Sequence, residues 1–183
     1  MILEEKKITL KNGTEAILKT PEVEDAEMML ENIKVCCGET DFLSMCAEDW
    51  TEATVESEGK WVRSCRENEN TLLIACFVDG KIVGSSDINF MSDIKTYHRA
   101  GLGITIQRKY WNIGIGSAMF EELMKAAEEN EKNEIVELEF IEGNERAKAL
   151  YEKFGFEVIS VKPKSFKLKD GTYQNKVYMQ KYL

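Results

Sequence analysis

A stretch near the middle of the chain, GITIQRKYWNIGIGSA from Gly103 to Ala118, has the residue types and spacing of an anion-binding turn. Its first residues alternate as in a strand, and a helical pattern begins at Gly114 and Gly116. Glycine lets the backbone approach a ligand closely, and Ser117 adds a hydroxyl beside the unpaired amides of the first helical turn. Amide donors and the positive end of the helix dipole converge there, so the turn could bind phosphate. The alternative is a plain strand-to-helix turn.

A second segment, ELEFIEGNERAKALYEKFGF from Glu137 to Phe156, strengthens the functional interpretation. Together the two segments resemble the GNAT superfamily of N-acetyltransferases. The first is similar to the CoA-pyrophosphate loop of that family. The second is similar to its Asn-x-x-Ala-x-x-Leu-Tyr-x-Lys-x-Gly-Phe block, with these residues in register: Asn144, Ala147, Leu150, Tyr151, Lys153, Gly155 and Phe156. One loop position departs from the family, because Trp111 stands where members usually carry Arg or Gln.

The resemblance implies acetyl-CoA as a co-substrate and no metal. It assigns the pyrophosphate to the glycine turn and the pantetheine arm to extended backbone, which can pair with the amides of pantetheine where the neighbouring strand splays away. Asn144 would lie near the same arm, and it could also cap the helix that follows. The cofactor-binding residues implied are Ile104, Ile106, Trp111, Asn112, Gly114, Gly116, Ser117 and Asn144.

Two residues of the second segment are candidates for proton transfer. Tyr151 has a phenol with an ordinary pKa of about 10, so it is protonated at neutral pH and can donate a proton to a departing thiolate. Glu139 has a placement resembling the catalytic glutamate of the protein N-terminal alanine acetyltransferases in the family, and it could accept the ammonium proton. Each residue also has a purely structural alternative. Tyr151 could simply pack on the apolar face of its helix, and Glu139 could be a strand residue that faces solvent. Asp87, Glu142 and ordered water are further candidates for the base.

The leading functional hypothesis is therefore an N-acetyltransferase in which a primary amine of a small polar molecule attacks acetyl-CoA directly in a ternary complex. A covalent cysteine route is not indicated, because neither segment contains a cysteine. A protein N-terminus or lysine is the alternative acceptor. A non-catalytic acyl-CoA-binding sensor is the alternative function. A dinucleotide-binding unit ranks last, because the Gly-x-Gly turn lacks the third glycine of that motif.

Composition limits the partners. The 183 residues include 33 acidic and 24 basic ones, and the resulting net charge of -9 disfavours nucleic acid and anionic membranes while it suits a cationic amine. Many soluble proteins are as acidic for solubility alone. No signal peptide and no apolar run near about 18 residues is apparent, so we expect a cytoplasmic protein. By analogy with the family, it could form a homodimer.

Cysteine and histidine usage points away from disulfides and metals. His98 is the only histidine, so His-rich metal sites and a Ser-His-Asp triad are poorly supported. No C-x-x-C pair occurs, and an odd number of cysteines argues against a complete disulfide framework. We expect reduced thiols at Cys36, Cys37, Cys46, Cys65 and Cys76.

The elements that must position the two segments can be read from periodicity and turn residues. An Asn12-Gly13 turn predicts a hairpin within Ile8–Lys19, and Thr20-Pro21 predicts the start of a helix that runs to about Val35 and is broken by Gly38. A second helix is expected within Asp49–Asn68. Trp50, Trp61, Phe42 and Met45 near these helices could form an apolar wall on the acceptor side or belong to the core.

The remaining chain predicts a sheet with two more helices. Strands are expected at Leu72–Val78, Lys81–Phe90, Tyr97–Gln107 and Ile135–Ile141, then at Phe156–Lys162, Ser165–Lys169 and Tyr173–Tyr182. Helices are expected from Gly114 to Glu129 and from Asn144 to Gly155. The whole chain, 1–183, is expected to form one GNAT-like acyl-CoA N-acyltransferase domain of the α/β (α+β) class, with a mixed, mostly antiparallel sheet flanked by helices.

Overall fold

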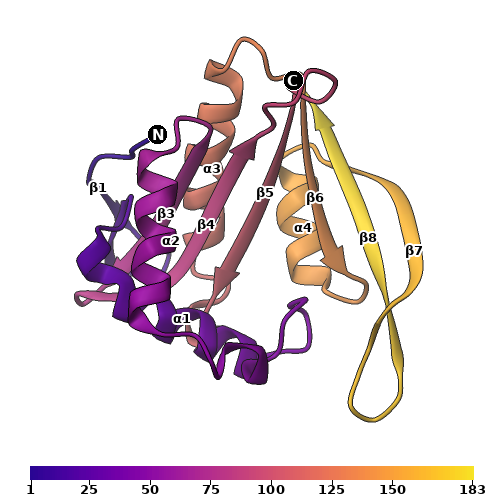
Figure 1. The fold of residues 1–183 in the computed structure, drawn as a ribbon, viewed down its shortest axis with the longest axis horizontal. Helices are drawn as coiled ribbons and strands as arrows, with labels where there is room; N and C mark the ends of the chain where they lie inside the picture. The colour runs from indigo at the N-terminus through magenta and orange to yellow at the C-terminus, as the bar shows by residue number, and fades with distance from the viewer.

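One mixed sheet organises the protein. The structure, a computed structural model, describes residues 1–183, and the sheet has the strand order β1-β2-β3-β4-β5-β6-β8-β7 (Figure 1). The strands are β1 (Lys6–Thr9), β2 (Glu15–Lys19), β3 (Thr71–Val78), β4 (Lys81–Phe90), β5 (Arg99–Ile106), β6 (Ile135–Ile141), β7 (Glu157–Lys167) and β8 (Tyr173–Tyr182). The α-helices are α1 (Ala26–Glu39), α2 (Val55–Glu67), α3 (Ile115–Glu129) and α4 (Glu145–Lys153).

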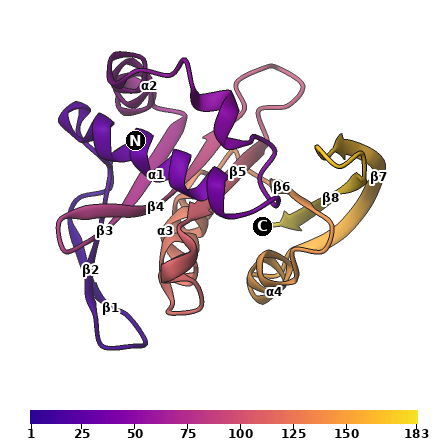
Figure 2. The ribbon, with the colours of Figure 1, turned by 90° about the horizontal axis from the view of Figure 1, so that it is seen from below.

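Helices cover both faces of the sheet. Figure 2 shows α1 and α2 on one face and α3 on the opposite face. The central strand β3, TLLIACFV, is buried along its whole length because both of its faces are covered. Its alternate residues Leu72, Ile74 and Cys76 join the core beneath α3, whereas Leu73 and Ala75 join a smaller core beneath α1 and α2. The predicted fold class, a mostly antiparallel sheet flanked by helices, is confirmed.

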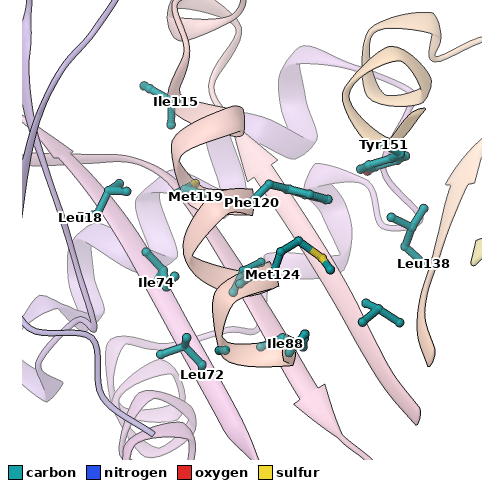
Figure 3. Packing of buried hydrophobic residues seen from close by; sticks show 14 of the residues in the cluster. Leu18, Leu72, Ile74, Ile88, Ile115, Met119, Phe120, Met124, Leu138 and Tyr151 are labelled. Carbon is teal, nitrogen blue, oxygen red and sulfur yellow. The ribbon is translucent and has the colours of Figure 1, made fainter. Parts of the chain in front are cut away.

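The core beneath α3 extends to α4. Figure 3 shows Phe120 reaching from α3 toward Tyr151 on α4, and Met119 and Met124 of α3 belong to the same core. Phe120, Met119 and Ile115 are essentially inaccessible to solvent. Burying a side chain of this size contributes about 1.5–3 kcal/mol, so the core fixes α3 and α4 relative to the sheet.

Strands β5 and β6 form the only parallel pair, and they pair for a short distance. Register contacts join Arg99 to Ile135, Ala100 to Val136 and Gly101 to Glu137, and none follows. Beyond this point the strands diverge, as Figure 1 shows. Strand β6 instead pairs with β8 from Ile135 to Ile141. The remaining residues of β5 therefore have an edge with no strand beside it.

Two predicted boundaries are wrong. Helix α1 begins at Ala26 after a 3-10 turn, Val23–Asp25, and Thr20 does not cap it, because its hydroxyl accepts the backbone amide of Leu3 at 2.9 Å. The helix also continues through Gly38 to Glu39. A glycine costs a helix only about 1 kcal/mol, so burial of neighbouring Cys36 and Cys37 outweighs it.

Strand β7 also differs from the prediction, because Glu157–Lys167 forms one strand instead of two. The pairing with β8 is irregular between Lys162 and Phe166, where Pro163 cannot donate a hydrogen bond and Lys164 has a positive φ of 52°. The strand continues past this irregularity. The predicted hairpin with Tyr173–Tyr182 and the boundaries of β6 are confirmed.

Candidate active site

A cavity of about 550 Å³ lies where β5 and β6 diverge. At one end it is lined by the start of α3 and the loop before it, which we call the α3 end. At the other it is lined by α1 and the loop that follows, together with side chains of β6, β7 and β8, which we call the α1 end. Phe42 joins these groups, because its ring lies 3.7 Å from the Cβ position of Gly143, just beyond β6.

The free edge of β5 presents backbone groups to the cavity. The Gln107 amide donates to the Val83 carbonyl at 3.0 Å, and the Met91 amide donates to the Arg99 carbonyl at 2.9 Å. The backbone amide and carbonyl groups of the odd-numbered residues of β5 therefore point toward β4. Because an antiparallel ladder alternates, the amide and carbonyl groups of Ile104 and Ile106 point toward the diverging side. Both residues line the cavity, and pairing of their backbone with a pantetheine arm stays a prediction. The Ile106 carbonyl accepts one hydrogen bond, from Trp111 Nε1 at 2.7 Å.

Three backbone amides are free at the start of α3. The first intrahelical bond of the turn runs from Ala118 to the Gly114 carbonyl at 3.1 Å, and the amides of Ile115, Gly116 and Ser117 donate to no group of the chain. Gly114 has a φ of 105°, a left-handed conformation that favours glycine. These donors and the helix dipole make the α3 end suited to an anion.

Gly116 and Asn112 shape this turn through packing and backbone conformation. A Cβ at Gly116 would lie 3.1 Å from Leu150 Cδ2 and 3.5 Å from Ile106 Cδ1, so this glycine allows α3 to pack against α4 and β5. Asn112 adopts a positive φ of 63°, which asparagine tolerates better than most residues. Both residues line the cavity.

Two lysines that the sequence did not single out as binding residues flank the free amides. Lys153 Nζ, at the end of α4, donates to Ser117 Oγ at 3.0 Å. Lys11, in the first hairpin, lies with Cγ 3.6 Å from the Cβ position of Gly114, and its amide donates to the Ile113 carbonyl at 2.9 Å. Lys11 is far from the motif in sequence, so only the fold brings this cation to the turn.

Tyr151 lies on α4 between the core and the cavity. Its ring packs against Phe120 and Phe140, with centroid separations of 5.4 and 5.8 Å. Burial raises the pKa of Tyr151 to about 12, and the charge of nearby Arg146 opposes this shift. The phenol therefore stays protonated throughout the neutral range, as a proton donor requires.

Asn144 is the N-cap of α4. Its side-chain oxygen accepts the backbone amide of Ala147 at 3.2 Å, and the residue is buried at the cavity wall. The capping interpretation of Asn144 is therefore confirmed. A residue that starts α4 also sets where Tyr151, two turns later, meets the cavity.

Of the three carboxylates considered as a base, only Glu139 lines the cavity. It is about half exposed and forms an ion pair with Lys176 of β8. Asp87 lies on β4 opposite Gly103, where burial raises the pKa of its carboxyl and Asn89 donates to it. Glu142 accepts the side-chain amide of Asn175 at 2.9 Å outside the cavity.

The α1 end combines apolar and charged groups. Of the four large side chains considered for either an acceptor wall or the core, Phe42 and Met45 line the cavity, whereas Trp50 and Trp61 do not. Cys36 of α1 also lines it, and burial raises the pKa of that thiol to about 12, so it is not a reactive thiolate. Lys176 and Phe166, which no local motif identifies, complete this end.

The site thus brings together an anion-binding turn, a free strand edge, a protonated phenol and a carboxylate. No group of three or more His, Cys, Asp and Glu residues is arranged to hold a metal ion. None of the helices combines the length and the apolar character needed to cross a membrane. This arrangement can hold an extended phosphate-bearing molecule along β5 and move protons near its far end.

Comparisons with known proteins agree with this description. The model of the acetyltransferase (GNAT) family matches residues 32–156. The L-amino acid N-acetyltransferase AaaT of Escherichia coli (strain K12) is 30% identical over 107 residues, which are 58% of this chain and 65% of that protein, so the match spans slightly less than two thirds of its length.

Solved structures share the fold over nearly the whole chain. An acetyltransferase of the GNAT family from Streptococcus pneumoniae has a TM-score of 0.85 and 25% identity, covering 92% of this chain and 99% of that one. A ribosomal-protein-alanine N-acetyltransferase from Brucella melitensis has a TM-score of 0.76 and 22% identity, covering 91% and 99%. The protein yncA from Salmonella typhimurium, solved with its cofactor acetyl-CoA, has a TM-score of 0.78 and 14% identity, covering 92% and 94%.

Proposed function

The chain belongs to the GNAT family of acetyltransferases, and from this premise we propose that it transfers the acetyl group of acetyl-CoA to the primary amine of a small polar molecule. The observation that carries the proposal is one cavity that is lined by Gly116 and Ser117 at the start of α3, the open edge of β5, Tyr151 and Glu139. One extended thioester could contact the first three groups while an amine approaches from the α1 end.

The backbone supplies most of the proposed cofactor contacts. The amides of Ile115, Gly116 and Ser117 would bind the diphosphate, with Lys11 and Lys153 beside it. The backbone of Ile104 and Ile106 would pair with the pantetheine arm, as an added strand would. The roles of Asn112, Gly114 and Asn144 would be to hold this backbone in place.

The residues at the far end of the arm would move two protons. As the amine nitrogen bonds to the acetyl carbon and the carbon–sulfur bond breaks, the Tyr151 phenol would donate its proton to the leaving thiolate. The Glu139 carboxylate would accept the proton that the amine releases, directly or through water. The raised pKa of the buried Cys36 thiol favours this direct transfer over a route through an acetylated cysteine.

The charges at the α1 end favour an amino acid as the small polar acceptor. Glu139 and Lys176 form an ion pair at the cavity wall, so a carboxylate and an ammonium group are both available there. A zwitterionic amino acid offers the complementary pair: an ammonium for Glu139 and a carboxylate for Lys176. The curated relative from Escherichia coli is an L-amino acid N-acetyltransferase, which supports the same acceptor class.

An acceptor panel tests the proposal. Thiol release from acetyl-CoA would be followed with L-amino acids, with the matching amines that lack a carboxylate, and with short peptides. We expect turnover of amino acids, and Lys176→Met should raise their KM by about 10-fold while the KM of carboxylate-free amines changes little. Turnover of peptides alone would instead identify a protein acceptor, and acetyl-CoA binding without turnover of any compound would identify a sensor.

A further inference from the structure

Arg146, the second residue of α4, is a cation without an anionic partner. It takes part in none of the ion pairs of the chain, whereas Lys148, on the same helix, pairs with Glu152 at 3.9 Å. Arg146 is partly buried and lines the cavity, and desolvation lowers its pKa from the ordinary value. A partly desolvated guanidinium with five donors and no acceptor has a free capacity to bind an anion.

Trp111 holds Arg146 in a fixed place. The guanidinium carbon lies 3.2 Å from the centroid of the indole ring, a stacked cation–π arrangement. The indole is itself fixed, because Trp111 Nε1 donates to the Ile106 carbonyl at 2.7 Å. Trp111 is three residues before Gly114. The stack therefore holds the cation on an indole that is anchored to the last residue of β5, in the loop that leads to α3.

Helix α4 also lies along the turn, which supports this placement. Arg146, Leu150 and Lys153 have the i, i+4, i+7 spacing of one helix face. Leu150 contacts the Cβ position of Gly116 at 3.1 Å, and Lys153 donates to Ser117 at 3.0 Å. One face of α4 thus carries a cation at each end, with the free amides of α3 beside it.

Arg108, whose guanidinium carbon lies 5.3 Å from the centroid of the same indole ring, is already engaged. The backbone amide of Arg108 donates to a carboxylate oxygen of Glu39 at 2.6 Å, and its guanidinium donates to the Glu39 carbonyl. The chain as a whole carries a net charge of -9, which repels a phosphorylated ligand at long range. Local cations with free donors must offset this repulsion, and Arg146 is one.

We propose that Arg146, stacked on Trp111, binds the diphosphate of CoA. The cation that family members usually carry in the loop, at the position of Trp111, is here supplied from α4, and the indole orients it. This inference rests on the proposed use of acetyl-CoA, and it adds Arg146 and Trp111 as a binding pair. It makes Arg146 a cofactor-binding residue.

Affinities for CoA and pantetheine test this role. Pantetheine lacks the diphosphate and the nucleotide, so a contact to the diphosphate affects CoA alone. Titration calorimetry on the full chain should show that Arg146→Gln weakens CoA binding by about 10- to 100-fold. Arg146→Lys keeps the charge without the planar guanidinium, so its CoA affinity should lie between those of Arg146→Gln and the wild type. Pantetheine binding should be unchanged. Lys148→Gln, which removes one charge from α4 outside the cavity, should bind CoA like the wild type.

Other outcomes would overturn the inference in recognisable ways. Equal CoA affinity for Arg146→Gln and wild type, or equal losses for CoA and pantetheine, would remove Arg146 from the diphosphate. A rise in the acceptor KM at unchanged CoA affinity would place Arg146 at the acceptor instead. A wild-type chain that binds no CoA would overturn the proposed function together with this inference.

The role of the indole is tested separately. Trp111→Leu removes the aromatic face, so it should weaken CoA binding by about 3- to 10-fold and bring little further loss when Arg146→Gln is already present. Trp111→Phe keeps an aromatic face and should retain more of the affinity. If the losses from Trp111→Leu and Arg146→Gln multiply fully, the two residues act independently, and the stacked pair is contradicted.

Discussion

The α3 end of the cavity is built mainly from backbone, whereas the α1 end is built from side chains. At the α3 end, the free amides of 115–117 and the open edge of β5 belong to one continuous segment, 103–118. At the α1 end, Cys36, Phe42, Glu139 and Lys176 come from separate parts of the chain. Side chains at the α1 end can change without altering the backbone of the α3 end.

This difference separates two tasks. A backbone site needs glycine and a helix start, and its amides bind a phosphate whatever side chains they carry, while cations such as Arg146 add to its affinity. A side-chain site selects its ligand by charge and shape, as the Glu139–Lys176 ion pair would. Tyr151 lies where the two ends meet, because it packs on the α3 core and lines the cavity. Substitutions at each place should therefore affect different kinetic constants.

The largest effect is expected at this meeting point. Tyr151→Phe removes the proposed proton donor while keeping the ring that packs against Phe120, so kcat should fall by about 10²- to 10⁴-fold with little change in the KM for acetyl-CoA. Steady-state kinetics with both substrates varied measures this. Tyr173→Phe, at an exposed tyrosine outside the cavity, is the matched control. If Tyr151→Phe retains the wild-type kcat, Tyr151 contributes packing alone and does not donate the proton.

The same phenol should make stability depend on pH under alkaline conditions. The pKa of Tyr151 is about 12 in the folded state and about 10 when unfolded, so its contribution is fully present below pH 10 and is lost as the pH rises toward 12. This loss amounts to about 2–3 kcal/mol in the free energy of unfolding. Urea unfolding at several pH values would measure it as the difference between wild type and Tyr151→Phe. A difference that stays constant from pH 9 to 12 would contradict the raised pKa.

A smaller effect on kcat is expected from the carboxylate at the α1 end. Glu139→Gln keeps the size of the side chain and removes its charge, so kcat should fall by about 10- to 100-fold if the residue accepts the amine proton. CoA affinity, measured by calorimetry, should be unchanged because the α3 end is intact. Glu142→Gln, a carboxylate outside the cavity, is the control. Equal rates for the two variants would assign proton acceptance to water.

The smallest effect is expected from backbone strain in the turn. Gly114→Ala places a side chain at a φ of 105°, so the turn should shift and CoA affinity should fall by about 3- to 10-fold. Gly13→Ala imposes a similar strain at a φ of 82° in the first hairpin, with open space around it. Both variants should lose stability to urea, and only Gly114→Ala should lose CoA affinity. Equal CoA affinities would show that the turn does not bind the diphosphate.

The comparison of the two ends also explains what the sequence could predict. The strand at Ile135–Ile141 and the starts of α3 and α4 were predictable, because alternation, Gly114 and Asn144 are local signals. The start of α1 was not, since Thr20 and Pro21 resemble a helix start but the Thr20 hydroxyl bonds to Leu3 instead.

The site residues also divide into those that a local sequence signal identifies and those that only the folded structure brings to the cavity. Ile104, Gly114 and Tyr151 belong to motifs whose spacing brings them to the cavity. Arg146 lies within such a motif, but its stacking on Trp111 has no sequence periodicity and could not be predicted. Lys11 and Lys176 reach the cavity from the first and last hairpins, so only the folded sheet brings them to the site.

The most direct test of the central claim is a crystal structure of the protein with acetyl-CoA. We expect the diphosphate to lie within hydrogen-bond distance of the amides of 115–117, the pantetheine arm to pair with Ile104, and the Tyr151 hydroxyl to face the sulfur. A diphosphate bound away from α3, or a Tyr151 hydroxyl directed away from the sulfur, would contradict it.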